Sequence, residues 1–146
     1  MSIEIQPAAI HDIKHNDFWR HRPNLAAPGK SRFGGRGLIA LREIKPSSLI
    51  DMACTVEITE EQCLQLDEIH PIGDFYFAHP ENPKAGLMAY GIMSFCNHAK
   101  NANADIRWER HDSLGWLAIL VALNTISERE EITYRYKCPL WFSADA

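Results

Sequence analysis

Residues 90–104, which read YGIMSFCNHAKNANA, constrain the fold more than any other stretch of this 146-residue chain. An apolar run stops abruptly at Asn97 and His98, and no acidic residue follows until Asp105. Asn and His each offer a hydrogen-bond donor and an acceptor, so apolar flanks around such a pair suit a pocket for the edge of a planar heterocycle. A helix end capped by Asn97 is the alternative, and an isolated Asn-His pair favours it.

Two further motifs flank this pair. Gly34-Gly35-Arg36-Gly37 precedes an apolar segment upstream, and EEITYRY occupies residues 130–136 downstream. In this order the three segments resemble the SET-domain family of protein lysine methyltransferases, which carries G-x-G, then F-x-N-H-S-C-x-P-N-A, and then G-E-E-L-T-Y-D-Y. The resemblance covers residues 32–136. The matching residues are Gly35, Gly37, Phe95, Asn97, His98, Asn103, Ala104, Glu130, Glu131, Thr133, Tyr134 and Tyr136.

Some positions depart from the family pattern, although none removes a side chain that the family's chemistry needs. They are Ser94 for Arg, Ala99 and Lys100 for Ser-Cys, Ala102 for Pro, and Arg129 for a turn Gly. The change at Arg129 bears on the turn geometry, because Gly supplies a positive φ at no steric cost. The family's zinc-binding tail is also missing, since Cys138 alone cannot build a tetrahedral zinc site.

The resemblance implies a mainly β fold with short helices, the SET-domain (β-clip) fold. Several small sheets are expected, with a C-terminal pseudoknot that brings the N-H and Y-x-Y motifs to one site. The length of 146 residues predicts a single domain, 1–146, with an N-terminal extension at 1–31, a motif-bearing core at 32–136 and a tail at 137–146.

The resemblance also assigns roles to individual residues. Tyr136 matches the catalytic tyrosine and Tyr134 the neighbouring residue of the lysine channel. The cofactor-binding residues that it implies for S-adenosyl-L-methionine are Gly35, Arg36, Gly37, Phe95, Asn97, His98 and Trp141, with Asn103 behind them. Trp141 and Phe142 would fold over the cofactor, and core packing or a homodimer contact is their alternative role. Tyr76 is a candidate for a further channel wall that no motif fixes.

Local patterns predict individual elements. The outline A-L-x-x-I occurs at residues 40–44 and again at 122–126, each time with an Ile six residues on, and this predicts two strand-turn-strand arms. A capping box at residues 59–62 predicts a short amphipathic helix up to His70. Further strands are expected at residues 38–42, 74–78, 105–109 and 116–123, the last of them central and buried. Loops are expected at Pro28-Gly29 and at residues 80–86.

Composition limits the classes of partner and location. No apolar run reaches the ~20 residues of a membrane span and no signal peptide is evident, so we expect a cytoplasmic protein without a membrane contact. A net charge of -4 argues against a direct nucleic-acid binder and suits a basic, lysine-bearing polypeptide substrate.

Metal binding is not expected. The four cysteines lack C-x-x-C spacing, which indicates free thiols. His11 and His15 have the i,i+4 spacing of two ligands, but no acidic third ligand is near, so solvated side chains are the favoured interpretation.

The resemblance therefore implies an S-adenosylmethionine-dependent protein lysine N-methyltransferase, and in the family a Tyr at the position of Tyr134 is typical of enzymes that add mainly one methyl group. A catalytically silent SET-fold module that binds a protein partner, as a homodimer, is the main alternative. A metal-binding protein that uses the N-terminal histidines is a third. The joint presence of Asn97, His98, Tyr134 and Tyr136 favours the enzyme over the silent module, whereas Arg129 and the missing tail are compatible with the silent module.

Overall fold

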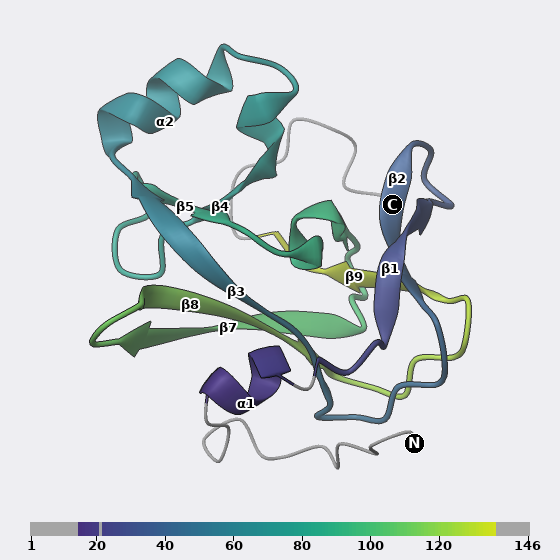
Figure 1. The fold of residues 1–146 in the computed structure, drawn as a ribbon. Helices are drawn as coiled ribbons and strands as arrows, with labels where there is room; N and C mark the ends of the chain where they lie inside the picture. Colours follow the sequence, from purple (N-terminus) through teal and green to yellow (C-terminus); the bar gives the residue numbers. More distant parts are fainter. Residues whose placement is uncertain (1–14, 21, 137–146) are drawn as a thin grey trace.

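Two curled sheets make up the body of the domain (Figure 1). The structure, a computed structural model, describes residues 15–20 and 22–136. The first sheet has the order β1-β2-β9-β6 and contains β1 (Ala26–Lys30), β2 (Arg36–Ala40), β9 (Glu131–Tyr134) and β6 (Asn97–His98). The second has the order β4-β5-β3-β8-β7 and contains β4 (Tyr76–Ala78), β5 (Gly86–Ala89), β3 (Leu49–Ile58), β8 (Gly115–Ala122) and β7 (Ala104–His111).

Four short helices accompany the sheets in the described part of the chain. They are α1 (His15–Arg20), α2 (Glu60–Asp67) and the 3-10 helices η2 (Ile72–Phe75) and η3 (Ile92–Phe95). None of these helices is long and apolar enough to cross a membrane. The mainly β architecture predicted from the sequence is confirmed.

β8 is the buried central strand that its apolar sequence predicts. It pairs with β3 on one side and β7 on the other, and every residue after Gly115 is buried. Alternate side chains such as Leu120 join the main core, whereas Leu117 and Ile119 join a second cluster with Phe18 of α1. Because both faces are covered, the strand needs apolar residues at nearly every position.

The two A-L-x-x-I arms pair with each other. Ile44 and Ile126 form an antiparallel bridge through two backbone hydrogen bonds of 2.8 Å, and both side chains are buried. The pairing is reciprocal, since Ser47 N donates to Ala122 O and Arg129 N donates to Ala40 O, each at 2.8 Å. The internal repeat predicted the two arms, and the structure shows in addition that backbone hydrogen bonds join them to each other.

The same turn conformation occurs at equivalent positions of both arms. Ser47 has φ 67° and Arg129 has φ 70°, and they are the non-glycine residues with positive φ in the described ranges. Arg129 thus adopts the left-handed conformation for which the family pattern places glycine. L-residues pay roughly 1–2 kcal/mol for this conformation, so each turn stores local strain.

Some elements differ from the prediction. Pro28 and Gly29 lie in strand β1 and not in a loop, because β1 is an edge strand where the missing N–H of proline is tolerated. The predicted strand at residues 74–78 begins only at Tyr76, since η2 precedes it. β5 begins inside the segment expected to be a loop and was not predicted.

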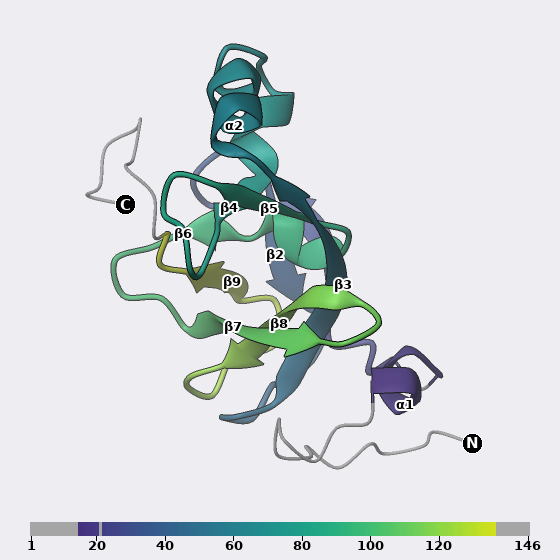
Figure 2. The same ribbon diagram turned by 90° about the vertical axis from the view of Figure 1, so that its left-hand side faces the viewer.

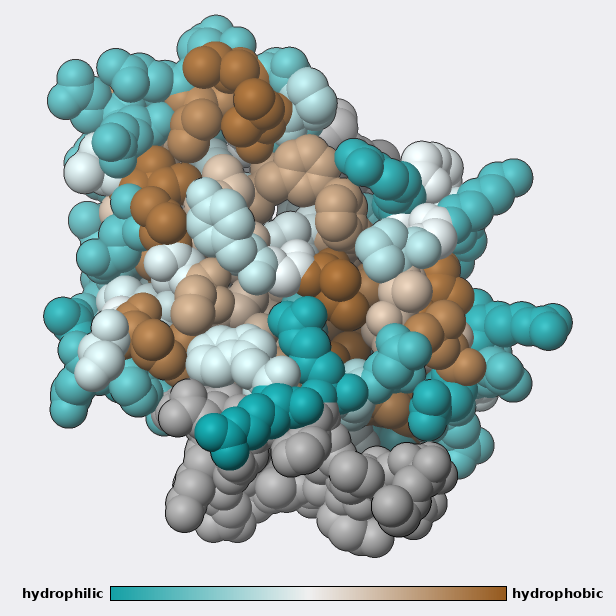
Figure 3. All heavy atoms as spheres, viewed as in Figure 1, coloured by the Kyte–Doolittle hydropathy of each residue, from teal (hydrophilic) through white to brown (hydrophobic). Residues whose placement is uncertain are grey.

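Helix α2 confirms the capping box and contradicts the amphipathic pattern. Thr59 and Gln62 exchange side-chain and backbone hydrogen bonds of 3.0 and 3.2 Å, but the helix ends at Asp67 instead of His70. Cys63 is its buried residue, whereas Leu64 is 64% exposed. Figure 3 shows apolar side chains gathered on the surface over α2 and η2.

The strained turn generates a stability prediction. Arg129→Gly should raise the free energy of unfolding by about 0.5–1 kcal/mol, because relief of the left-handed strain exceeds the entropy lost by glycine. Chemical denaturation measures the change. Glu128→Gly is the matched control, since this neighbouring exposed residue has no positive φ, and it should lower stability. A shift of both variants in the same direction would contradict the assignment of strain to Arg129.

Candidate active site

β9 joins the three sequence motifs. It pairs in parallel with β6, where Asn97 lies opposite Thr133 and His98 opposite Tyr134, and Figure 2 shows the two strands side by side. On its other side it pairs antiparallel with β2, where Leu38 lies opposite Ile132. The prediction that the N-H and Y-x-Y motifs meet is confirmed.

Asn103 fixes β9 in this position. Its amide nitrogen donates to Glu131 O and its amide oxygen accepts from Thr133 N, both at 2.9 Å. The side chain thereby imitates a neighbouring strand and pairs two backbone groups of β9 that would otherwise need other partners. This places Asn103 behind the site, where the sequence predicted it.

Glu131 is the centre of a buried hydrogen-bond network. Its carboxylate, on a residue only 5% exposed, accepts from Ser31 Oγ at 2.8 Å, from Arg32 N at 3.0 Å and from Asn97 Nδ2 at 3.0 Å. A Cβ on Gly37 would lie 2.7 Å from Glu131 Oε2. Residue 37 must therefore be glycine because this carboxylate leaves no room for a side chain.

Asn97 has a structural role that the sequence did not predict. Besides Glu131, its amide nitrogen lies 2.9 Å from Arg36 O and 3.1 Å from Ser31 Oγ. The side chain thus ties β6 to the residues on both sides of the β1–β2 turn. Ser31 lies outside the three motifs, so no sequence signal identified it.

The β1–β2 turn depends on its glycines for conformation. Gly34 and Gly35 have φ of 94° and 66°, and Ser31 N donates to Gly35 O at 3.0 Å. A Cβ at either glycine would meet no atom within 4 Å. Glycine is favoured here because of the backbone angle, and the turn faces open space.

A row of aromatic rings extends from the site toward β7. Ring centroids are 5.3 Å apart for His98 and Tyr136, 4.8 Å for Tyr136 and Tyr134, and 5.6 Å for Tyr134 and Phe77. Trp108 follows at 6.0 Å from Phe77. These separations are typical of favourable ring contacts, so the rings form one continuous aromatic cluster, in which Tyr134 and Phe77 are buried.

Phe77, rather than Tyr76, contacts Tyr134. The Tyr76 hydroxyl donates to Asp67 Oδ1 of α2 at 2.6 Å. Alternation along a strand predicts that neighbours point to opposite faces, but it does not say which face meets the site. Tyr76 was a candidate channel wall that no motif fixed, and the contact of Phe77 with Tyr134 was not predicted.

Tyr136 is anchored at both its backbone and its hydroxyl. Its N–H donates to His98 Nδ1 at 3.1 Å, and its hydroxyl donates to Cys96 O at 3.1 Å. Tyr134 is buried, whereas Tyr136 is half-buried. The hydroxyl of Tyr136 thus bonds to the backbone of a buried residue, Cys96.

Arg36 and Phe95 form a cationic and aromatic edge beside Asn97. The Arg36 guanidinium lies over the Phe95 ring at 4.9 Å from its centroid, and over the Phe75 ring at 6.0 Å. Arg36 is exposed and Phe95 is half-buried. Such an edge can pair with a carboxylate and can stack on a heterocycle.

Burial controls the charge of His98. Desolvation lowers the pKa of this imidazole below 6.5, and the nearby positive charge of Arg135 lowers it further. Its Nδ1 accepts from Tyr136 N, which places the ring proton of the neutral form on Nε2. His98 is therefore neutral at pH 7.

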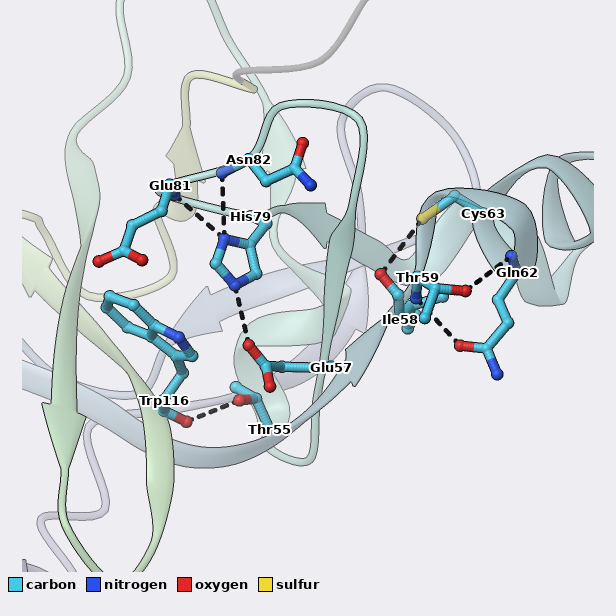
Figure 4. A network of polar contacts seen from close by, with 10 residues as sticks. All are labelled: Thr55, Glu57, Ile58, Thr59, Gln62, Cys63, His79, Glu81, Asn82 and Trp116. Carbon is cyan, nitrogen blue, oxygen red and sulfur yellow. Dashed lines mark hydrogen bonds and ion pairs between the residues drawn. The ribbon is translucent and has the colours of Figure 1, made fainter.

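A second polar network closes the loop between β4 and β5 (Figure 4). His79 Nε2 lies 3.0 Å from Glu57 Oε1, while its Nδ1 accepts from the backbone N–H groups of Glu81 and Asn82. The loop so fixed follows directly on β4, which carries Phe77.

Some predicted features lie outside the described residues, namely Trp141, Phe142, Cys138 and His11. Within the described part of the chain, no group of three or more His, Cys, Asp or Glu side chains could hold a metal ion.

Comparison with known proteins places this arrangement in a family context. A family model described as "SET domain" matches residues 35–137. A candidate histone methyltransferase of Plasmodium falciparum aligns with a TM-score of 0.62 and 25% identity, covering 82% of this chain and 99% of that chain. A search of curated proteins found no match.

Larger assemblies contain the same fold. Polycomb Repressive Complex 2 of Chaetomium thermophilum, bound to the inhibitor GSK126, aligns with a TM-score of 0.66 and 19% identity over 83% of this chain and 17% of that chain. Its autoinhibited form bound to S-adenosylmethionine aligns with a TM-score of 0.66 and 17% identity over 81% of this chain. The present chain spans only 16% of that second chain.

The lowered pKa of His98 predicts a pH-dependent stability. The unfolded chain binds the imidazole proton more readily, so the contribution is complete above pH 6.5 and falls as pH decreases toward the folded-state pKa. Denaturation curves between about pH 5 and pH 7.5 measure this slope. His98→Asn keeps an acceptor for Tyr136 N without titrating, so its curve should be flatter. Equal slopes for variant and wild type would contradict the role of His98.

Proposed function

The chain belongs to the SET-domain family, and from this premise we propose that it is a protein lysine N-methyltransferase that uses S-adenosyl-L-methionine. The observation that supports this most strongly is that His98 on β6 lies opposite Tyr134 on the parallel strand β9, and that the Tyr136 ring, two residues beyond β9, contacts both. The aromatic cluster that they form suits the side chain of a lysine, and the half-buried residue Tyr136 supplies the hydroxyl that is proposed to contact the amine.

The donor set fits the proposed cofactor. The Arg36 guanidinium suits its carboxylate, and Phe95 offers a ring for the adenine. The residues proposed to hold it are Gly35, Arg36, Gly37, Phe95, Asn97 and His98, together with Trp141 from outside the described ranges. When bound, the cofactor would supply a methyl group from its sulfonium, whose sulfur leaves as a neutral thioether. Asn97 would act chiefly by fixing the β1–β2 turn, since its amide nitrogen already lies beside three protein acceptors.

We propose that the aromatic cluster favours the neutral form of the lysine amine, which is the reactive form. A free lysine has a pKa of about 10.4, so its amine must lose a proton before it can act as a nucleophile. Desolvation between rings disfavours the charged amine and thereby lowers this pKa. The Tyr136 hydroxyl is oriented by its bond to Cys96 O, and a hydroxyl that donates its proton can still accept from an amine through its oxygen.

The net charge and the structural neighbours support one class of substrate. The Plasmodium neighbour is named as a histone methyltransferase, and histones are basic proteins. The net charge of -4 on this chain would favour encounter with a basic polypeptide. We propose a lysine on such a protein as the substrate.

A catalytically silent protein-binding module is the second candidate. The exposed side chains of Leu64, Ile69 and Ile72 favour it, because a group of apolar residues at the surface can mark a protein contact. Calorimetric titration with S-adenosylmethionine separates the two candidates, since the silent module has no need of the cofactor. The absence of a heat of binding at millimolar cofactor would overturn the proposal that this protein is a methyltransferase.

Tyr136→Phe tests the mechanism. The variant should turn over roughly a hundredfold more slowly, because the hydroxyl that aims the amine is gone. Its affinity for S-adenosylmethionine should stay nearly unchanged. Single-turnover methylation with radiolabelled cofactor and a host protein extract measures the rate, and calorimetry measures the affinity. Equal rates for variant and wild type would remove Tyr136 from the mechanism.

Tyr134→Phe tests the product. The Tyr134 ring lies between those of Tyr136 and Phe77, and we propose that its hydroxyl takes up volume that a methylated amine needs in order to rotate. We expect mainly monomethyl-lysine from the wild type and a shift toward dimethyl- and trimethyl-lysine from the variant. Mass spectrometry of a methylated peptide distinguishes the products. Trimethyl-lysine as the main wild-type product would show that Tyr134 does not limit the reaction.

A further inference from the structure

Asp51 is a buried carboxylate that the proposed site does not use. It lies on β3, is 2% exposed, and accepts from Met52 N at 2.9 Å on its own strand. Its Oδ2 accepts from Met93 N of η3 at 3.0 Å, and Arg22 Nη2 lies 3.7 Å from its Oδ1. Burial raises the pKa of this carboxyl, and the backbone donors and Arg22 oppose that rise. A buried acid held in this way needs a structural reason.

Gly91 shows that the position of this carboxylate is specific. A Cβ at residue 91 would lie 2.5 Å from Asp51 Oδ2 and 2.9 Å from the Cβ of Ala53. The φ of Gly91 is -161°, an extended conformation open to any residue. Residue 91 must therefore be glycine because the Asp51 carboxylate occupies the space that a side chain at this position would need.

A series of hydrogen bonds leads from Asp51 to the Tyr136 hydroxyl. Met93 N donates to Asp51, Cys96 N donates to Met93 O at 3.0 Å, and the Tyr136 hydroxyl donates to Cys96 O at 3.1 Å. The side chains of Met93 and Cys96 are buried in the main core. The short helix η3 is thus held at its start by Asp51, and its end presents the carbonyl that orients the tyrosine.

We propose that Asp51 is a positioning residue for the Tyr136 hydroxyl and acts on it through η3. This inference rests on the proposed function, because its kinetic test requires methyl transfer. Removing the bond to Met93 N would let η3 shift and would misplace Cys96 O. His98 would be affected less, since β9 also holds it through strand pairing and through Tyr136 N.

Asp51→Asn is the direct test. The amide is isosteric, but it cannot accept two backbone N–H groups on different oxygens. We expect about a tenfold fall in kcat, with the dissociation constant for S-adenosylmethionine nearly unchanged. Gly91→Ala places a methyl group against Asp51 Oδ2 and so disturbs the bond to Met93 N while Asp51 is kept. It should lower kcat by a similar factor, and it provides the test if Asp51→Asn does not fold.

Asp105→Asn is the matched control. Asp105 accepts from the next backbone N–H, Ile106 N, at 2.9 Å and has Arg107 Nε at 3.6 Å. It therefore repeats the local contacts of Asp51 without a bond to η3. Its kcat should equal that of the wild type.

The double variant with Tyr136→Phe decides between positioning and general destabilisation. If Asp51 acts through the Tyr136 hydroxyl, Asp51→Asn should slow the Tyr136→Phe enzyme by much less than tenfold, because the oriented group is already absent. An undiminished tenfold effect would overturn the proposal. An unchanged kcat for Asp51→Asn in the wild-type background would do so as well.

Hydrogen exchange separates this inference from the proposed function. Faster exchange at the Met93 and Cys96 amides in Asp51→Asn, but not in Asp105→Asn, supports the link even if the wild type transfers no methyl group. In that case the proposed function fails and the link from Asp51 to η3 stands. Unchanged exchange at both amides would overturn the link whatever the activity.

Discussion

Strand β9 has only four residues, all of them buried, and the need to pair its backbone groups organises the structure around it. β2 pairs with one side, β6 with the other, and the Asn103 side chain takes Glu131 O and Thr133 N. An unpaired buried backbone group costs about 1–3 kcal/mol, so none of these partners can leave without a large loss for a small domain. The three sequence motifs therefore meet because β9 requires all of them, and the site is formed by the same contacts that make the fold stable.

Two buried carboxylates fix the segment that enters the site. Asp51 accepts from Met93 at the start of η3, and Glu131 accepts from Asn97 just beyond its end. Each carboxylate offsets the cost of its burial by accepting several N–H or O–H groups. The residues between these anchors include Cys96, whose carbonyl orients Tyr136. A flexible surface loop would not hold this carbonyl in one place.

Sequence patterns predicted the features that depend on neighbouring residues and missed those that depend on distant ones. The capping box of Thr59 and Gln62 is local and was confirmed. The buried face of α2 depends on what packs against it, and the predicted face was wrong because Leu64 is exposed. The repeated A-L-x-x-I outline predicted two arms, but the pairing of Ile44 with Ile126 is a tertiary contact that no local pattern contains.

The candidate site follows the same division. The family resemblance predicted that His98 and Tyr134 meet, and strand pairing confirms it. It did not predict what holds Asn97, because Ser31 is outside the motifs, nor that Phe77 contacts Tyr134, because alternation does not identify the inward face.

Arg129 replaces the glycine of the family pattern, and the structure shows why the site tolerates this change. Its N–H still bonds to Ala40 O with φ at 70°, so pairing of the two arms imposes a conformation that the residue alone would avoid. Long-range contacts thus compensate for a local departure, and the position of β9 directly after this turn is kept.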